Sequence, residues 1–314
     1  MKKALSLLFV LILSLSFVSC GRSTVSHSPG SEPALPSVTD ALGNTVSLPL
    51  NARVVSCYAS FTDCWLLSGG SVVGVTDDAV EEGIVSSDQA LSVGSVKHVN
   101  LEQVLSLNPD YVILSADLAA HLQLEAALKA ARICYGYFRV DTFGDYRDLM
   151  KQFCAVNGGR DRYDTYVTDV ETQIRSVLNR IPENTESSVL LLRVYSTGMK
   201  AKTDDNLAGQ ILKELGLRNV ADETPSLLED LSVEKILLED PDYIVFLTMG
   251  DEVAAMAFLQ QNVENHPAWT GLSAVKNETC FLLPKDLFHY KPNERWGESY
   301  EYLAKRIYPE IFGE

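Results

Sequence analysis

The sequence has 314 residues, of which 46% are hydrophobic, and its mean hydropathy is close to zero. That length is sufficient for two ordinary hydrophobic cores, and that polarity excludes a protein with many membrane spans. The formal net charge of −16 removes any electrostatic basis for binding nucleic acid.

The first residues have the pattern of a secretory signal peptide. Lys2 and Lys3 precede an apolar run over residues 4–18, which is too short to span a bilayer comfortably. Loss of both lysines on cleavage would take the formal charge to −18. We expect residues 1–19 to be the signal peptide of an extracytoplasmic protein.

Cys20 follows this run, and the sequence Phe17-Val18-Ser19 before it resembles the bacterial lipobox. In that motif the cysteine receives a diacylglyceryl group, which predicts a lipid anchor at Cys20 as the only membrane attachment. Because Phe17 stands where Leu is usual, ordinary signal peptidase cleavage is the alternative. Residues 20–36 are rich in Ser, Pro and Gly, so we expect the lipidated cysteine to be followed by a flexible tether.

Beyond the tether, strand patterns and helical periodicities alternate along the chain. This alternation predicts a mostly parallel sheet with helices on both faces. In the first lobe, 37–156, we expect strands at 46–48, 53–57, 72–75, 111–114 and 135–140, and helices at 63–67, 101–107 and 118–131.

A helical period from Tyr163 to Ile181 predicts a linking helix over residues 157–182, about 36 Å long. The alternation then restarts in the second lobe, 183–314. There we expect strands at 189–194 and 280–283, and helices at 206–215, 253–263 and 293–307. The predicted fold class is α/β, with two Rossmann-like lobes of mostly parallel sheet joined by one long rigid α-helix.

One stretch occurs twice, which indicates that the two lobes are related. LEQVLSLNPDYVILS at 101–115 and VEKILLEDPDYIVFL at 233–247 align without gaps at an offset of 132 residues. We interpret Pro-Asp-Tyr as structural, because Pro ends the helix, Asp makes the turn and Tyr enters the strand. The identical pairs are Glu102/Glu234, Leu105/Leu237, Pro109/Pro241, Asp110/Asp242 and Tyr111/Tyr243.

Glu102 and Glu234 each stand second in the predicted helix, after the capping candidates Asn100 and Ser232. A carboxylate there complements the helix dipole by about 0.3–1 kcal/mol, which would explain both residues structurally. Their equal placement in two related lobes allows another interpretation, in which both carboxylates dock onto a partner with two basic patches.

The sequence contains none of the common catalytic or nucleotide-binding motifs, which argues against an enzyme. We expect no intrinsic metal or cofactor. After Cys20, an odd number of cysteines remains, without metal-site spacing. We expect mainly structural thiols, with one disulfide as the open alternative. These cysteines are Cys57, Cys64, Cys134, Cys154 and Cys280.

Several blocks together resemble the extracytoplasmic substrate-binding lipoproteins of ABC importers for ferric siderophores, haem and cobalamin. They are the lipobox-like start, the repeated helix-Pro-Asp-strand module, the long helix, GLRNVAD at 216–222, HPAW at 266–269 and FHYKPNERW at 288–296. The resemblance covers essentially the whole mature domain. It implies two α/β lobes with little hinge motion and a ligand in the cleft between them. It also implies that one glutamate per lobe, here Glu102 and Glu234, docks onto arginines of the permease dimer.

In this family the ligand contacts come from loops at the strand ends that face the cleft. Here those loops carry aromatic and cationic side chains, which suit a large flat or anionic chelate. The candidate ligand-binding residues are Tyr58, Ser60, Phe61, Lys97, His98 and Ser115 in the first lobe, and Tyr195, Ser196, Met199, Lys202, Leu228, Thr248, Met249, Phe288, His289 and Tyr290 in the second.

Several of these residues have open alternatives. His98 or His289 could be an axial ligand of haem iron or cobalt, and Tyr58, Tyr195 or Tyr290 could bind haem iron, although hydrogen bonding is their ordinary role. We expect Arg295 and Trp296 to pack or cap the last helix. The acidic cluster Asp77, Asp78, Glu81 and Glu82 is expected in a solvated loop, where a position at the cleft rim would favour a cationic chelate.

The predicted function is capture of an iron complex, a ferric siderophore or haem, and its delivery to an ABC permease dimer with its ATPase. We expect a monomer, lipid-anchored outside the membrane. Cobalamin is the first alternative, since only the cleft contacts would differ. A zinc or manganese binder is less favoured because no histidine pair has ligand-like spacing. A surface-anchored hydrolase lacks its motif, and an adhesion lipoprotein would leave the paired glutamates unexplained.

Overall fold

The computed structural model describes residues 35–183, 185–229 and 231–313. The predicted signal peptide, Cys20 and the tether up to residue 34 lie outside the described residues. Within the described part, no helix is both long and apolar enough to cross a membrane.

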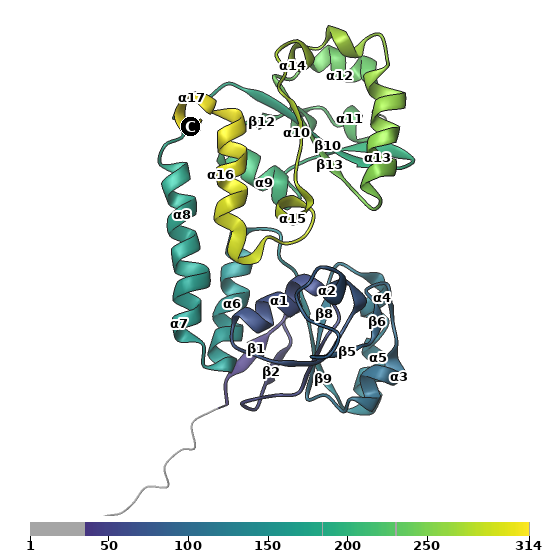
Figure 1. The fold of residues 1–314 in the computed structure, drawn as a ribbon, viewed down its shortest axis with the longest axis vertical. Coiled ribbons are helices and arrows are strands. Elements are labelled where there is room, and N and C mark those ends of the chain that lie inside the picture. Colours follow the sequence, from purple (N-terminus) through teal and green to yellow (C-terminus); the bar gives the residue numbers. More distant parts are fainter. Residues whose placement is uncertain (1–34, 184, 230, 314) are drawn as a thin grey trace, which may run out of the picture. The chain divides into compact units, whose positions relative to one another are not determined.

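The first lobe is a parallel sheet in the order β5-β4-β3-β8-β9, covered by helices (Figure 1). Tyr111 and Ile113 on β8 face one core cluster, whereas Val112 and Leu114 face another. This period of two shows that both faces of the sheet are covered, as predicted. The strands are β3 (Val54–Ser56), β4 (Val72–Val75), β5 (Leu91–Ser92), β8 (Tyr111–Ser115) and β9 (Cys134–Phe138), with antiparallel pairs β1 (Ser37–Thr39) and β2 (Thr45–Ser47), and β6 (Gly94–Ser95) and β7 (His98–Val99); the helices are α1 (Ala59–Leu67), α2 (Asp77–Glu81), α3 (Leu101–Ser106), α4 (Ala119–Leu122) and α5 (Glu125–Ala131).

The second lobe has the sheet order β11-β10-β13-β14, with β12 also paired to β10. All its pairs are parallel except β10 with β11, which form an antiparallel hairpin. The predicted α/β class with two mostly parallel sheets is confirmed. The strands are β10 (Ser188–Tyr195), β11 (Gly198–Lys202), β12 (Arg218–Asn219), β13 (Tyr243–Thr248) and β14 (Cys280–Leu282); the helices are α9 (Leu207–Glu214), α10 (Val220–Glu223), α11 (Ser226–Glu229), α12 (Val233–Glu239), α13 (Glu252–Leu259) with a π turn (Gln260–Glu264), a 3-10 turn (Trp269–Gly271), α14 (Ser273–Lys276) and α15 (Lys285–Phe288).

The helical connection between the lobes differs from the prediction at both ends. Helix α6 (Phe143–Asn157), which was not predicted, begins at a capping box in which Thr142 Oγ1 and Asp145 Oδ2 each accept the other residue's backbone N–H. Gly158, with φ of 69°, ends it. A continuous rod follows, from α7 (Arg160–Tyr163) through a π turn (Asp164–Thr168) to α8 (Asp169–Leu178), so the predicted bounds of 157–182 were too wide. The lobe boundaries at 156 and 183 stay a prediction.

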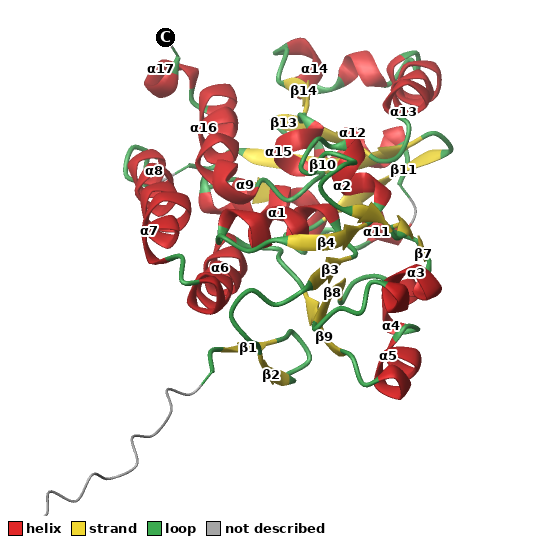
Figure 2. Ribbon diagram, turned by 60° about the horizontal axis from the view of Figure 1, so that its bottom comes forward, coloured by secondary structure: helices red, strands yellow, loops and turns green. Residues whose placement is uncertain are grey.

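One hydrophobic core runs through both lobes along this rod. A 3-10 turn (Asn293–Arg295) leads into α16 (Trp296–Ile307), which lies beside α8 (Figure 2), and α17 (Pro309–Phe312) follows. The same core cluster contains Ile113 of the first sheet, Ile174 of α8, Leu303 of α16 and Leu191 of the second sheet. Hinge motion between the sheets would therefore expose apolar surface, which opposes it.

The predicted helix at 118–131 is wrong as a single helix, because the chain forms α4 and α5 instead. His121 at the end of α4 is fully buried. Its Nδ1 accepts the N–H of Ser115 at 2.9 Å, and its Nε2 lies 2.9 Å from the carbonyl oxygen of Val96. These bonds fix α4 against the end of β8, and burial lowers the pKa of His121, which keeps the imidazole neutral.

All five cysteines in the described part of the chain are free, so the alternative of one disulfide is not supported. Cys57, Cys64 and Cys154 are buried. Burial raises the pKa of Cys57 to about 12 and that of Cys154 to about 11, so these thiols stay protonated at neutral pH.

The two repeat copies adopt the same local structure, which confirms the structural interpretation of Pro-Asp-Tyr. Asp110 Oδ2 accepts the backbone N–H of Arg53 at 2.8 Å, directly before β3. In the second lobe Asp242 Oδ2 accepts the N–H and the hydroxyl of Ser188, both at 2.7 Å, where β10 begins. In each lobe this aspartate therefore joins the start of one central strand to the start of its neighbour.

We predict that Asp110→Ala and Asp242→Ala each lower the free energy of unfolding by about 1–3 kcal/mol, because each leaves a strand N–H without its acceptor. Asp242→Ala should cost more, since that carboxylate accepts two hydrogen bonds. Urea unfolding measures both. Asp169→Ala, at an exposed position of α8, is the matched control; equal effects of all three substitutions would contradict the assignment.

Candidate functional site

Three adjoining pockets open between the two sheets, and Tyr290 lines all of them. We call them the central pocket (about 390 Å³), the side pocket (about 270 Å³) and the acidic pocket (about 510 Å³). Tyr58, Leu247 and Phe288 line the central pocket and also belong to, or pack against, the core cluster that joins the lobes. The central pocket is therefore the open end of that core. Its lining is Tyr58, Ala59, Ser60, Asp78, Glu82, Val96 and Lys97 from the first lobe, and Arg193, Leu247, Met249, Gly250, Phe288, His289 and Tyr290 from the second.

The first lobe contributes a phenol and two carboxyl groups. Tyr58 lies where β3 gives way to α1, and burial, with Asp78 nearby, raises the pKa of its phenol to about 12. Asp78 Oδ2 accepts the N–H of Ala59 at 3.0 Å, whereas Oδ1 is buried without a hydrogen-bond partner among the described residues. Burial, Asp78, Asp63 and Glu81 together raise the pKa of Glu82 to about 7. Glu82 is therefore partly protonated at neutral pH, and the same wall of the pocket also carries the cation Lys97.

The second lobe contributes a wall of opposite sign. Arg193 follows Val189 and Leu191 on one face of β10, and its Nε is buried without a hydrogen-bond partner in the described part of the chain. Burial and the positive charges of Lys285, Arg193 and Lys291 lower the pKa of His289 to about 4. His289 is therefore neutral at neutral pH, and it makes an edge-to-face contact with Tyr290, with ring centroids 5.0 Å apart.

The segment that carries His289 and Tyr290 is attached to helix α1 of the first lobe. Asn293, which is buried with φ of 49°, donates from Nδ2 to Asp63 Oδ2 at 2.7 Å and to the carbonyl oxygen of Ser60 at 2.9 Å. Lys291 Nζ lies 3.1 Å from Asp141 Oδ1. Both lobes thus hold the pocket aromatics in place before any ligand arrives.

Half of the residues predicted to bind ligand lie at these pockets. Lys202 lines the side pocket, where its Nζ is 2.8 Å from Asp205 Oδ2. The others line the central pocket: Tyr58, Ser60, Lys97, Met249, Phe288, His289 and Tyr290.

The other half of the predicted residues do not line these pockets. Phe61 is in the core against Phe138, and Ser115 and Thr248 are buried at strand ends. Met199 packs into the core of the second lobe, because strand alternation points it away from the cleft. Tyr195 and Ser196 are at the turn of the β10–β11 hairpin, and His98 and Leu228 are exposed.

Arg193 is the main residue that the sequence analysis missed. A signal existed, because it is the only charged residue within the apolar run VLLLRV of β10 and stands next to the carboxyl end of the strand. A charge at such a position marks the point where a buried strand reaches a cleft. The acidic cluster was expected in a solvated loop, or at the cleft rim, where it would favour a cationic chelate; it lies instead on and directly after helix α2, and Asp78 and Glu82 line the central pocket, which agrees with the rim position.

The two repeat glutamates are exposed at the starts of α3 and α12. Glu234 Oε1 lies 3.4 Å from His266 Nε2, and hydrogen bonds from its own N–H and from Ser232 lower the pKa of Glu234. For Glu102 there is no ion pair within the described residues. Both carboxylates are therefore accessible to a partner.

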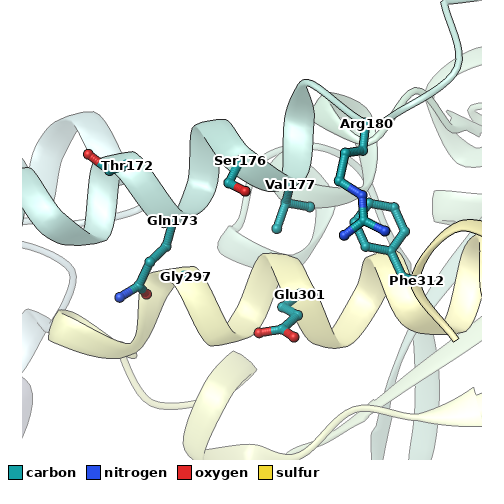
Figure 3. A pocket seen from close by; sticks show the side chains of 8 residues that line it. All are labelled: Thr172, Gln173, Ser176, Val177, Arg180, Gly297, Glu301 and Phe312. Atoms are coloured by element: carbon teal, nitrogen blue, oxygen red, sulfur yellow. The ribbon is translucent and has the colours of Figure 1, made fainter. Parts of the chain in front are cut away.

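A further pocket of about 350 Å³ lies between α8 and α16, away from the cleft (Figure 3). The guanidinium of Arg180 stacks 4.1 Å above the ring of Phe312 at one end of it. It shares no residue with the three cleft pockets. Among the described residues, no group of three or more His, Cys, Asp or Glu is arranged to hold a metal ion.

Comparison with known proteins finds relatives over nearly the whole chain. The putative ABC transporter substrate-binding lipoprotein YhfQ of Bacillus subtilis (strain 168) is 27% identical over 295 residues, 88% of this chain and 89% of that protein. The Fe(3+)-citrate-binding protein YfmC of the same organism is 24% identical over 318 residues, 99% of this chain and 98% of that protein.

The fold is similar to that of S. aureus IsdE complexed with heme, with a TM-score of 0.67 and 17% identity, over 82% of this chain and 99% of that one. Residues 54–287, more than half of the sequence, match the family model described as periplasmic binding protein. The chain belongs to the periplasmic binding protein family.

Proposed function

We propose that this chain is the substrate-binding component of an ABC importer, which captures an iron complex in the central pocket and delivers it to a permease. The observation that carries the proposal is a preformed pocket between two lobes, lined by Tyr58, Phe288, His289 and Tyr290 together with Lys97 and Arg193. Aromatic rings and cations of this kind suit a large chelate. The similarity to an Fe(3+)-citrate-binding protein and to a protein whose structure contains heme supports an iron complex as the cargo.

We also propose how the chain is attached to the membrane and where it contacts the permease. A monomer without enzymatic activity, anchored by a lipid at Cys20 outside the membrane, would present the cleft to the permease dimer with its ATPase. Relatives named as lipoproteins support this arrangement. Glu102 and Glu234, one exposed carboxylate on each lobe, would contact the permease.

Direct titration tests the function. Residues 20–314 with Cys20→Ser, titrated with ferric citrate, ferrichrome, haemin and cobalamin, should bind at least one iron complex with a micromolar or lower Kd, on the order of 8 kcal/mol. Tryptophan fluorescence and the visible spectrum report binding. Binding of cobalamin alone would move the assignment to corrinoids, and binding of zinc or manganese alone would overturn it.

For the bound iron complex, we predict that Tyr290→Ala weakens the affinity by about tenfold, since the ring lines all three pockets and supplies apolar contact. Tyr195→Ala makes the same change at the β10–β11 turn, outside the pockets, and should change the Kd by less than about twofold. A larger effect at Tyr195 than at Tyr290 would contradict the placement of the site.

The docking proposal predicts a separation between binding and transport. Glu102→Ala combined with Glu234→Ala should leave the Kd for the iron complex unchanged while cellular uptake of radioactive iron falls about tenfold or more, because two charged contacts are lost. Glu239→Ala on α12 is the control. Normal uptake by the double variant would show that the two glutamates serve only their helices.

A further inference from the structure

The duplicated stretch contains one identical pair that the fold alone does not explain. Asp110 and Asp242 join neighbouring strands, whereas Leu105 and Leu237 are 36% and 37% exposed. Every position outside the five identical pairs has changed between the two copies. A single exposed leucine is ordinary, but the same leucine at the same place on both lobes indicates a shared function at the surface.

Other residues hold the two helices against their lobes. Val104 of α3 and Ile236 of α12, which correspond in the repeat, are buried in the cores of the first and the second lobe. Leu237 Cδ1 lies beside Gly271 of the 3-10 turn, although 37% of the residue stays exposed. Packing therefore accounts for only part of the Leu237 side chain.

Each of these leucines shares a helix face with a glutamate that is proposed to contact the permease. Leu105 follows Glu102 by three positions, and Leu237 follows Glu234 by three, so the members of each pair are neighbours on the helix surface. The next position on the same face is Ser106 in the first lobe and Leu238 in the second. We call these sets the first docking face, which is Glu102, Leu105 and Ser106, and the second docking face, which is Glu234, Leu237 and Leu238.

The two docking faces differ in polarity. Leu238 is 84% exposed, the largest exposed fraction of any large hydrophobic residue in the described part of the chain. At the corresponding position, Ser106 donates its hydroxyl to the carbonyl oxygen of Gln103 at 2.8 Å, within its own helix. A partner that covers both faces therefore buries more apolar surface on the second lobe than on the first.

Resting on the proposed function, we propose that Leu105, Leu237 and Leu238 contact the permease, which presents a cation beside an apolar patch to each lobe and the larger patch to the second lobe. The two carboxylates steer the encounter, and burial of the leucines strengthens the complex once it has formed. Because the two docking faces are unequal, the same contacts fix which lobe binds to which half of the permease dimer.

Photo-crosslinking in cells locates the contact without depending on the cargo. The full chain carries p-benzoylphenylalanine in place of Leu105, of Leu238 or, as the control, of Leu50, which is 67% exposed and lies outside both docking faces. Illumination should join the first two proteins to a permease subunit, identified by mass spectrometry, and should leave the control unlinked. A product between two copies of this chain, or no permease product from either docking face, would overturn the inference.

Substitution tests whether the leucines strengthen docking. The readout is cellular uptake of whichever of ferric citrate, ferrichrome and haemin the parent protein binds. Leu237→Ser combined with Leu238→Ser should lower uptake about tenfold, and Leu105→Ser about threefold, because the first pair removes more apolar contact. Leu50→Ser should change uptake by less than about 1.5-fold.

Two further measurements show that the loss comes from the docking contact. Leu237→Met combined with Leu238→Met keeps the apolar volume and should retain uptake. The Kd for the iron complex should stay unchanged in every leucine variant, since none of these leucines lines a cleft pocket. Urea unfolding of each variant identifies a loss of uptake that comes from lower stability.

The outcomes separate this inference from the proposed function. If Glu102→Ala with Glu234→Ala lowers uptake while the leucine-to-serine variants transport normally, the leucines are not contacts and the proposed function stands. If the double glutamate variant transports normally and no position is joined to a permease, the docking proposal fails and takes the inference with it. If the parent protein binds none of the three complexes, the iron cargo is wrong and the crosslinking result alone decides the inference.

Discussion

The structure depends on one continuous hydrophobic core that passes from the first sheet, along α8 and α16, to the second sheet. Trp65 and Trp296, both fully buried, lie within it, and truncating such a residue costs on the order of 3–5 kcal/mol. Because a single core serves both lobes, the sheets cannot separate without exposing apolar surface. The cleft is therefore a fixed feature of the fold rather than a product of ligand binding.

The central pocket lies where the shared core reaches the surface between the two lobes. On β10, Val189 and Leu191 face the shared core, and the next residue on the same face is Arg193, at the pocket. Asn293 then attaches the segment bearing His289 and Tyr290 to helix α1. Strand alternation brings Arg193 to the pocket, and the buried asparagine fixes the aromatics, so pocket geometry is set by interactions that involve no ligand.

The sequence predicted the features that repeat. Strand alternation, helix periodicity and the duplicated Pro-Asp-Tyr give the two parallel sheets, because burial on both faces leaves a regular pattern in the chain. Helix α6 was missed although Thr142 and Asp145 form a capping box there, and the single helix at 118–131 failed because His121 bonds to Ser115 and Val96, which sequence spacing cannot reveal.

The candidate site was only half predictable, because membership of a strand-end loop does not determine which way a side chain points. Phe61 and Thr248 are in such places but are buried, whereas Arg193 lies within an apolar strand, where the sequence does not predict a pocket residue. The sequence also does not show which cations of the cleft already form an ion pair. Lys202 and Arg193 are both cations near the end of a strand. The structure shows that Lys202 pairs with Asp205, whereas the buried Nε of Arg193 has no hydrogen-bond partner among the described residues.

In the proposed function, the iron complex binds in the pocket between the two lobes. Anomalous diffraction at the iron edge, from crystals of the protein with its bound ferric complex, tests it most directly. The account predicts one iron peak in the central pocket, between Tyr58 and His289. A peak outside the three cleft pockets, for example between α8 and α16 near Arg180, would contradict it.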